Sequence, residues 1–195
     1  AETGTLTAIW KGDFLHVYRR GQGSGRFNPA GRHISLAQDL SFYRLADLKT
    51  PWPLRPVMTN RTPVNPNPLY PKNLGYQFKG YYMDDELIPT FMYRSGNIKI
   101  EDRSTTKVTR QKFRLERTLT FDSPGDQTIW FRALTGKIRA ESKRQFQTPH
   151  LKLDIPALPT VLRRIKPSSK SSELLLKITL PKGKSTQKLT YELLQ

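Results

Sequence analysis

The chain has 195 residues, and 33 lysines and arginines against 16 aspartates and glutamates give it a net charge of +17. It contains no cysteine, which excludes disulfides, thiolate metal sites, iron–sulfur clusters and c-type haem attachment. No run of 18 apolar residues is present, which excludes a membrane-spanning helix. A chain this basic is attracted to acidic partners such as proteins, nucleic acid, anionic lipid or acidic glycan. The excess is uneven, with +5 over residues 1–106 and +12 over residues 107–195.

The amino terminus reads Ala1, Glu2, Thr3 and lacks an initiator methionine. Cleavage of a signal peptide leaves an end of this kind, with a small residue near the cut. We therefore predict a periplasmic or extracellular protein whose signal peptide has been removed.

The first half of the chain alternates strand signals with a proline-rich stretch. Residues 4–10 and 14–18 flank a short connection with glycine and aspartate, which predicts a hairpin. Seven of the fifteen prolines fall in residues 51–71. Each proline fixes φ and removes a backbone donor, so this stretch predicts a long, irregular crossing loop. Trp52 and Tyr70 are the side chains expected to pin that loop to a sheet.

Strand signals become dense from residue 76 onwards, and residues 98–103 alternate apolar with charged side chains as half-buried antiparallel strands do. In residues 107–121 one parity holds Phe113, Leu115, Arg117, Leu119 and Phe121, and the other holds Arg110, Lys112, Arg114 and Glu116. On a strand these sets face opposite ways. The pattern predicts three outward cations in a row, roughly 7 Å apart.

The rest of the chain continues this pattern. A turn at residues 122–126 precedes a predicted return strand at 128–134, and residues 174–180 and 188–194 predict a closing hairpin. Together these runs predict an all-β fold, a large antiparallel β-sandwich with a long proline-rich crossing loop. We place the main sandwich in residues 1–140, and a C-terminal β extension packed on the same body in residues 141–195.

Short motifs follow one another between residues 8 and 137. They are WKGDF at 10–14, FNPAG at 27–31, LSF at 40–42, PWP at 51–53, FKGY at 78–81, PTFMYR at 89–94, IED at 100–102, RTLTF at 117–121 and WFRA at 130–133. In this order they resemble a β domain of unknown function from large secreted haem-binding proteins of planctomycete-type bacteria, which accompanies c-type cytochrome and sugar-dehydrogenase-like modules. The resemblance implies a supersandwich-like fold and a redox neighbourhood. It supplies no catalytic residues, and the tail beyond about residue 140 lies outside it.

Residues suited to catalysis or metal binding do not form a recognisable pattern. The three histidines, His16, His33 and His150, lack metal-ligand spacing. The acidic turn at residues 84–86, with Glu101 and Asp102, offers a candidate carboxylate pair for glycoside hydrolysis. We expect the turn to be solvated and the other two carboxylates to pair with nearby arginines. We predict no catalytic residues, no metal site and no cofactor.

The favoured interpretation is a non-catalytic exported accessory or scaffold subunit that docks through a basic surface onto an acidic partner, such as a cytochrome or a membrane electron-transfer complex. An anionic membrane surface or a glycan is the next choice, and nucleic acid ranks lower because no known recognition motif is present. The candidate partner-binding residues are Arg110, Lys112, Arg114, Lys143, Arg144, Arg163, Arg164 and Lys166. A glycan-binding module or a carbohydrate-active enzyme is the alternative, with Trp10, Trp52, Tyr81 and Tyr93 as weak ligand-binding candidates.

Overall fold

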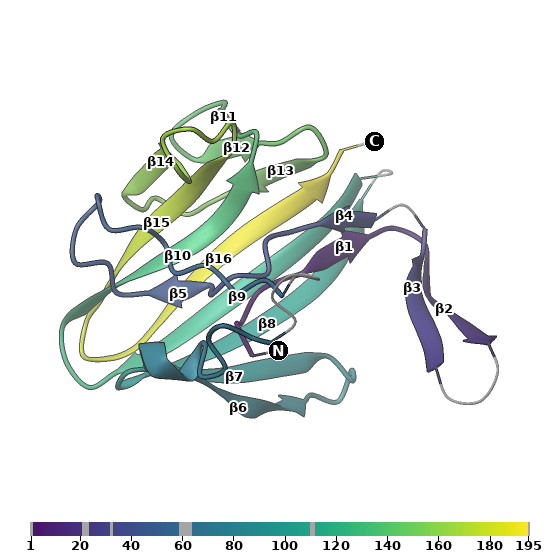
Figure 1. The fold of residues 1–195 in the computed structure, drawn as a ribbon, viewed down its shortest axis with the longest axis horizontal. Helices are drawn as coiled ribbons and strands as arrows, with labels where there is room; N and C mark the ends of the chain where they lie inside the picture. The colour runs from purple at the N-terminus through teal and green to yellow at the C-terminus, as the bar shows by residue number, and fades with distance from the viewer. Residues whose placement is uncertain (1, 21–23, 32, 59–63, 110–111, 195) are drawn as a thin grey trace.

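A computed structural model describes residues 2–20, 24–31, 33–58, 64–109 and 112–194. Two antiparallel sheets lie face to face and enclose a hydrophobic core between them (Figure 1). The predicted all-β sandwich is confirmed. Among the described residues, no helix is long and apolar enough to cross a membrane.

In the described part of the chain, the larger sheet has eight strands. In spatial order they are β11 (Arg139–Ala140), β12 (Gln145–Gln147), β13 (Leu151–Asp154), β16 (Gly183–Leu193), β9 (Lys112–Ser123), β8 (Ile98–Thr109), β7 (Pro89–Ser95) and β6 (Tyr76–Met83). The smaller sheet contains β14 (Thr160–Arg164), β15 (Ser172–Leu180), β10 (Gln127–Gly136) and β5 (Phe42–Tyr43). A 3-10 turn, η1 (Lys72–Leu74), precedes β6.

Two short strand pairs complete the fold near the amino terminus. β1 (Ala8–Trp10) pairs with β4 (His33–Ser35), and β2 (Asp13–Arg20) pairs with β3 (Ser24–Ala30). The β2–β3 pair projects from the sandwich (Figure 1). The predicted hairpin between residues 4–10 and 14–18 is therefore wrong, because each of these runs pairs with a later segment instead of with the other.

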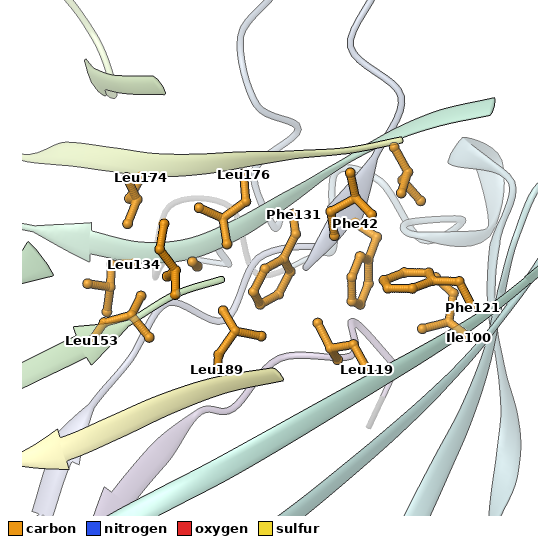
Figure 2. Close-up of a cluster of buried hydrophobic side chains, with 14 of the residues drawn as sticks. Phe42, Ile100, Leu119, Phe121, Phe131, Leu134, Leu153, Leu174, Leu176 and Leu189 are labelled. Atoms are coloured by element: carbon orange, nitrogen blue, oxygen red, sulfur yellow. The ribbon is translucent and has the colours of Figure 1, made fainter. Parts of the chain in front are cut away.

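The core lies between the inner faces of the two sheets, where Figure 2 shows side chains from both meeting. Phe42 of β5 lies at its centre, with its ring 4.9 Å from that of Phe131 on β10 and 5.7 Å from that of Phe121 on β9. Leu174 and Leu176 of β15 also point into this space (Figure 2). Alternate residues along the strands of both sheets thus supply one shared core, as period-two patterning requires.

Two other predicted hairpins are also wrong in their pairing. The turn after β9 carries the chain from the larger sheet to β10 in the smaller sheet, and the turn after β15 carries it back to β16. Turn residues specify a reversal of direction, but they do not specify whether the chain stays in the same sheet. The two crossings lie next to each other, since the Asp126 carboxylate accepts a hydrogen bond from the Lys182 amide at 3.1 Å.

The residues after position 140 supply central strands of the same sandwich. β16 lies between β13 and β9 and pairs with β9 from Gly183 to Glu192, while β15 pairs with β10 along its whole length. The strands after residue 140 therefore belong to the same two sheets as the strands before it. Removing the C-terminal segment would take a strand from the middle of each sheet.

The proline-rich segment lies against the smaller sheet, pinned as predicted by Trp52 and Tyr70, with residues 59–63 outside the described part. The Trp52 indole is buried and donates to the Leu40 carbonyl at 2.7 Å. The Tyr70 hydroxyl accepts from the Leu40 amide at 2.8 Å and donates to the Pro53 carbonyl at 3.3 Å. Burial raises the pKa of Tyr70 to about 12.

A chain of buried charges lies beneath this segment. Arg132 bridges Asp39 at 2.5 Å and Glu173 at 2.8 Å, and Glu173 in turn bonds Arg163 at 2.7 Å. Arg163 also donates to the carbonyl of Leu48, three residues before Pro51. Residues 44–58, which include Leu48 and the start of the proline-rich stretch, are here called the crossing segment. Glu173 is only 1% exposed, so it holds two cations away from water. These contacts fasten the crossing segment to strands β10, β14 and β15.

Candidate interaction surface

The outer face of the eight-stranded sheet gathers charged side chains from distant parts of the sequence. Leu119 and Phe121 point into the core, so the alternate residues of β9 point outward. Side chains of residues paired across an antiparallel ladder lie on the same face. Extending the observed pairings across the sheet assigns ten cations to this outer face, here called the basic face: Arg94, Lys99, Arg103, Lys107, Lys112, Arg114, Arg139, Lys152, Lys184 and Lys188.

Five carboxylates share the basic face: Glu101, Glu116, Asp122, Asp154 and Glu192. Between the charges lie small hydroxyl side chains, including Thr118, Thr120, Thr186 and Thr190. The described residues of this face therefore carry a twofold excess of positive charge on an open sheet. Its charges have both signs, which is the pattern expected where orientation matters as well as attraction.

One row of paired residues crosses six strands. It runs from β11 to β8 through Arg139, Gln147, Lys152, Glu192, Arg114 and Lys107. Neighbouring strands lie about 4.8 Å apart, so the row spans roughly 24 Å. Four cations from four separate stretches of sequence thus line up across the sheet.

Several cations of the basic face are neutralised within it. Glu192, which is 8% exposed, bonds Arg114 at 2.8 Å and Lys112 at 3.4 Å. Burial raises the pKa of Glu192, but the bonds from Arg114 and Lys112 outweigh it, so the pKa is lowered overall. The stabilisation from these pairs is thus present above the ordinary carboxyl pKa and is lost as the pH falls through the lowered value.

The cations that remain available lie mainly on β13 and β16. Lys107 bonds Glu116 at 2.7 Å and Lys99 bonds Asp122 at 3.5 Å. By contrast, Lys152, Lys184 and Lys188 have no ion pair among the residues that the structure describes. These three side chains can meet an external carboxylate without breaking an internal bond.

The eight cations predicted as partner-binding residues do not form one surface. Lys112 and Arg114 lie on the basic face, whereas Arg110 lies outside the described residues. Lys143 and Arg144 are exposed in the turn between β11 and β12. Arg164 and Lys166 are exposed at the end of β14 and in the loop that follows it.

Arg163, another of the eight, is bonded within the protein, with its side chain 17% exposed. Its guanidinium group bonds Glu173 and the carbonyl of Leu48 beneath the crossing segment. Arg163 and Arg164 are neighbours on one strand, so they face opposite ways, and only Arg164 faces water.

Two of the four weak ligand-binding candidates are buried. Trp52 is 3% exposed and Tyr93 is 4% exposed, so neither ring offers a stacking surface to a sugar. Trp10 is half-buried and donates to the Asp13 carbonyl at 3.1 Å. Tyr81 is exposed, with its ring centre 5.9 Å from that of Phe91. The four rings come from separate regions and do not assemble into one platform.

The candidate carboxylates are also separated. Asp102 points into the sandwich and forms a bidentate ion pair with Arg117. Its carboxylate oxygens accept hydrogen bonds from Arg117 Nε at 2.9 Å and from Arg117 Nη2 at 2.5 Å. Glu101 lies on the basic face, on the opposite side of β8. Asp84 accepts hydrogen bonds from Arg103 and from the amides of the turn that it begins. Within the described residues, no group of three or more acidic or histidine side chains is placed to hold a metal ion.

Arg117 is the one inward cation of β9, and it also holds the amino-terminal segment. Its Nη2 donates to the Gly4 carbonyl at 2.8 Å, and its guanidinium carbon lies 5.1 Å from the ring centre of Phe131. Burial acts to lower the pKa of Arg117, but Asp102 raises it above its ordinary value overall. Arg117 therefore stays charged and serves as an internal anchor.

Sequence reasoning missed the cations that distinguish the basic face. Lys184 and Lys188 alternate with inward residues such as Leu189 and Tyr191, so period-two patterning assigns them to one face of β16. The pattern does not show that β16 lies beside β9. That adjacency places these lysines on the same surface as Lys112 and Arg114.

Comparison with known proteins adds no relative to this description, since the chain matches no protein-family model and no curated protein.

Proposed function

We propose that this protein is a non-catalytic binding subunit that docks through its basic face onto an acidic protein partner. The observation that carries the proposal is the placement of ten cations against five carboxylates on one open sheet surface. Complementary charge of this kind speeds association and fixes orientation more than it adds affinity. A broad, open sheet surface of this kind suits docking of another protein.

The mixture of charges favours a protein as partner over a uniform polyanion. Glu101, Glu116 and Asp154 lie between the cations, so a continuous row of phosphates would meet like charges. A folded partner places its acidic groups opposite Lys152, Lys184 and Lys188 and keeps them away from the carboxylates. The resemblance of the motifs at residues 10–133 to an exported, redox-associated domain puts the acidic face of a cytochrome or electron-transfer complex first among such partners.

Charge reversal at the available cations tests this proposal. We expect the triple variant Lys152→Glu, Lys184→Glu, Lys188→Glu to lose at least tenfold in partner capture from an extract of the source organism at low salt. Each reversal replaces attraction by repulsion, and wild-type capture should itself fall steeply with added salt. The matched control is Lys49→Glu, Lys170→Glu, Lys177→Glu, which changes the charge equally on the side of the smaller sheet.

The measurement is the amount of acidic protein retained by each immobilised variant across a salt gradient, with thermal unfolding to verify that each is folded. Equal loss in both triple variants, or retention by the Lys152, Lys184, Lys188 variant, contradicts docking at the basic face. Absence of any salt-sensitive partner on the wild-type protein contradicts it as well.

A further inference from the structure

A groove opens at the corner of the basic face formed by β6, β7 and β8. Its volume is about 440 Å³, which lies in the range of sites that bind small ligands or protruding side chains. Met92 of β7 lines it together with Lys79, Arg94, Lys99 and Glu101. Three of these five side chains are cations, and they come from three adjacent strands.

Beside this groove, β6 carries a bulge at Lys79, one of the residues that line it. The ladder between β6 and β7 shifts register between Phe78 and Gly80, so Lys79 is inserted as an extra residue opposite β7. Gly80 has a φ of 112°, a conformation that side-chain-bearing residues rarely adopt. A Cβ built there would come within 3.9 Å of the Met92 terminal methyl group. Bulges with glycine often mark places where another molecule approaches the sheet closely.

Met92 is an apolar side chain among the outward residues that line this groove. It pairs with Glu101 of β8 on one side and Gly80 of β6 on the other, and both neighbours leave its flexible thioether accessible from the groove. Methionine adapts its shape to whatever packs on it, which is why it recurs at binding surfaces. An apolar side chain that enters the groove would contact Met92, and polar residues on either side of it in the same ligand would lie near Lys79, Arg94 and Lys99.

The charges around Met92 select for anionic groups. Lys79 and Arg94 have no ion pair within the described residues, and Arg94 donates only to the Gly96 carbonyl, at 2.8 Å. Lys99 is bonded to Asp122 at 3.5 Å, but its side chain is 77% exposed and free to turn toward a ligand. Glu101 is the single carboxylate lining the groove.

We propose that this groove receives an acidic segment of the docked protein partner, with one leucine or aromatic side chain of that segment packed on Met92 and its flanking carboxylates on Lys79 and Arg94. The inference rests on the proposed function and deepens it, since the groove is continuous with the basic face. Lys107 lies eight positions after Lys99 on β8, at the other end of the face and roughly 26 Å away. A partner with a standard interface covers both regions at once.

Binding of synthetic peptides tests the apolar anchor directly. The probe is a fluorescein-labelled eight-residue peptide of glutamates around a central leucine, followed by fluorescence anisotropy. We expect Leu→Ala in the peptide, or Met92→Ala in the protein, to weaken binding about tenfold, as loss of two or three buried methyl groups implies. The protein variant Lys79→Glu, Arg94→Glu should abolish binding of both peptides.

Two further results separate this inference from the proposed function. Equal affinity for the leucine and alanine peptides, unchanged by Met92→Ala, overturns the groove but leaves docking at the basic face intact. Partner capture that survives reversal of Lys152, Lys184 and Lys188 contradicts the proposed function, even if the peptide still binds. A matched control, Val108→Ala, removes an exposed apolar side chain outside the groove and should leave peptide binding unchanged.

Discussion

Replacing Arg117 with methionine is expected to lower the free energy of unfolding by about 3–5 kcal/mol, because it leaves the buried carboxylate of Asp102 without its counter-ion. Both side chains are almost fully buried, so water cannot take the place of the guanidinium group. The variant also removes the donor to the Gly4 carbonyl. Denaturant titration followed by tryptophan fluorescence measures the change.

A second variant shows that the loss comes from the stranded charge. The double variant Arg117→Met, Asp102→Leu removes both charges and should be more stable than the single variant, since an apolar pair can replace a buried ion pair at little cost. Arg139→Met is the matched control, because Arg139 bonds Glu141 in an exposed pair and should change stability by less than about 1 kcal/mol. A double variant no more stable than Arg117→Met would show that the cost lies elsewhere.

Replacing Glu173 with glutamine is expected to cost about 3–5 kcal/mol of unfolding free energy, because the buried Glu173 is the shared counter-ion of the buried Arg132 and the partly exposed Arg163. Arg132 keeps Asp39 as a partner, whereas Arg163 keeps only the Leu48 carbonyl. The crossing segment should therefore loosen together with the overall loss of stability. Denaturant titration and limited proteolysis within residues 44–58 measure the two effects.

The control for this prediction is the same substitution at an exposed pair. Glu141→Gln breaks the bond to Arg139 and should leave both the unfolding free energy and the cleavage of residues 44–58 unchanged. If Glu173→Gln behaves like Glu141→Gln, the buried charge chain does not fasten the crossing segment.

Local patterning predicted the features that depend on one strand or one segment. Alternation in residues 113–121 correctly placed Leu119 and Phe121 inside, and it grouped Arg117 with them although a cation is costly to bury. The density of prolines predicted the crossing segment and its two aromatic anchors. These features follow from backbone geometry and side-chain direction, which act over a few residues.

Strand pairing was not predictable in the same way. The turns after β9 and β15 look like hairpin turns in the sequence, yet each joins a strand of one sheet to a strand of the other. Only the burial of both apolar faces against each other decides between these outcomes, and that is a property of the whole chain. The same limit hid the basic face, because Lys107, Lys152 and Lys188 come to lie on one face only through long-range pairing.

Arg163 illustrates the limit for a single residue. In sequence it is half of an Arg-Arg pair in a polar, basic stretch, where a surface position is the reasonable expectation. In the structure it lies across from Glu173 on β15 and beneath the crossing segment. The crossing segment lies more than a hundred residues earlier in the sequence, so the residues around Arg163 do not indicate that it packs there.

The most direct test of docking through the basic face is a lysine footprint of the complex. The protein is acetylated with and without its captured acidic partner, and the rate at each lysine is read by mass spectrometry. Docking through the basic face predicts slower acetylation of Lys152, Lys184 and Lys188 in the complex, with unchanged rates at Lys49, Lys170 and Lys177. Protection of the second group with the first left accessible would place the partner on the other side of the sandwich and contradict docking through the basic face.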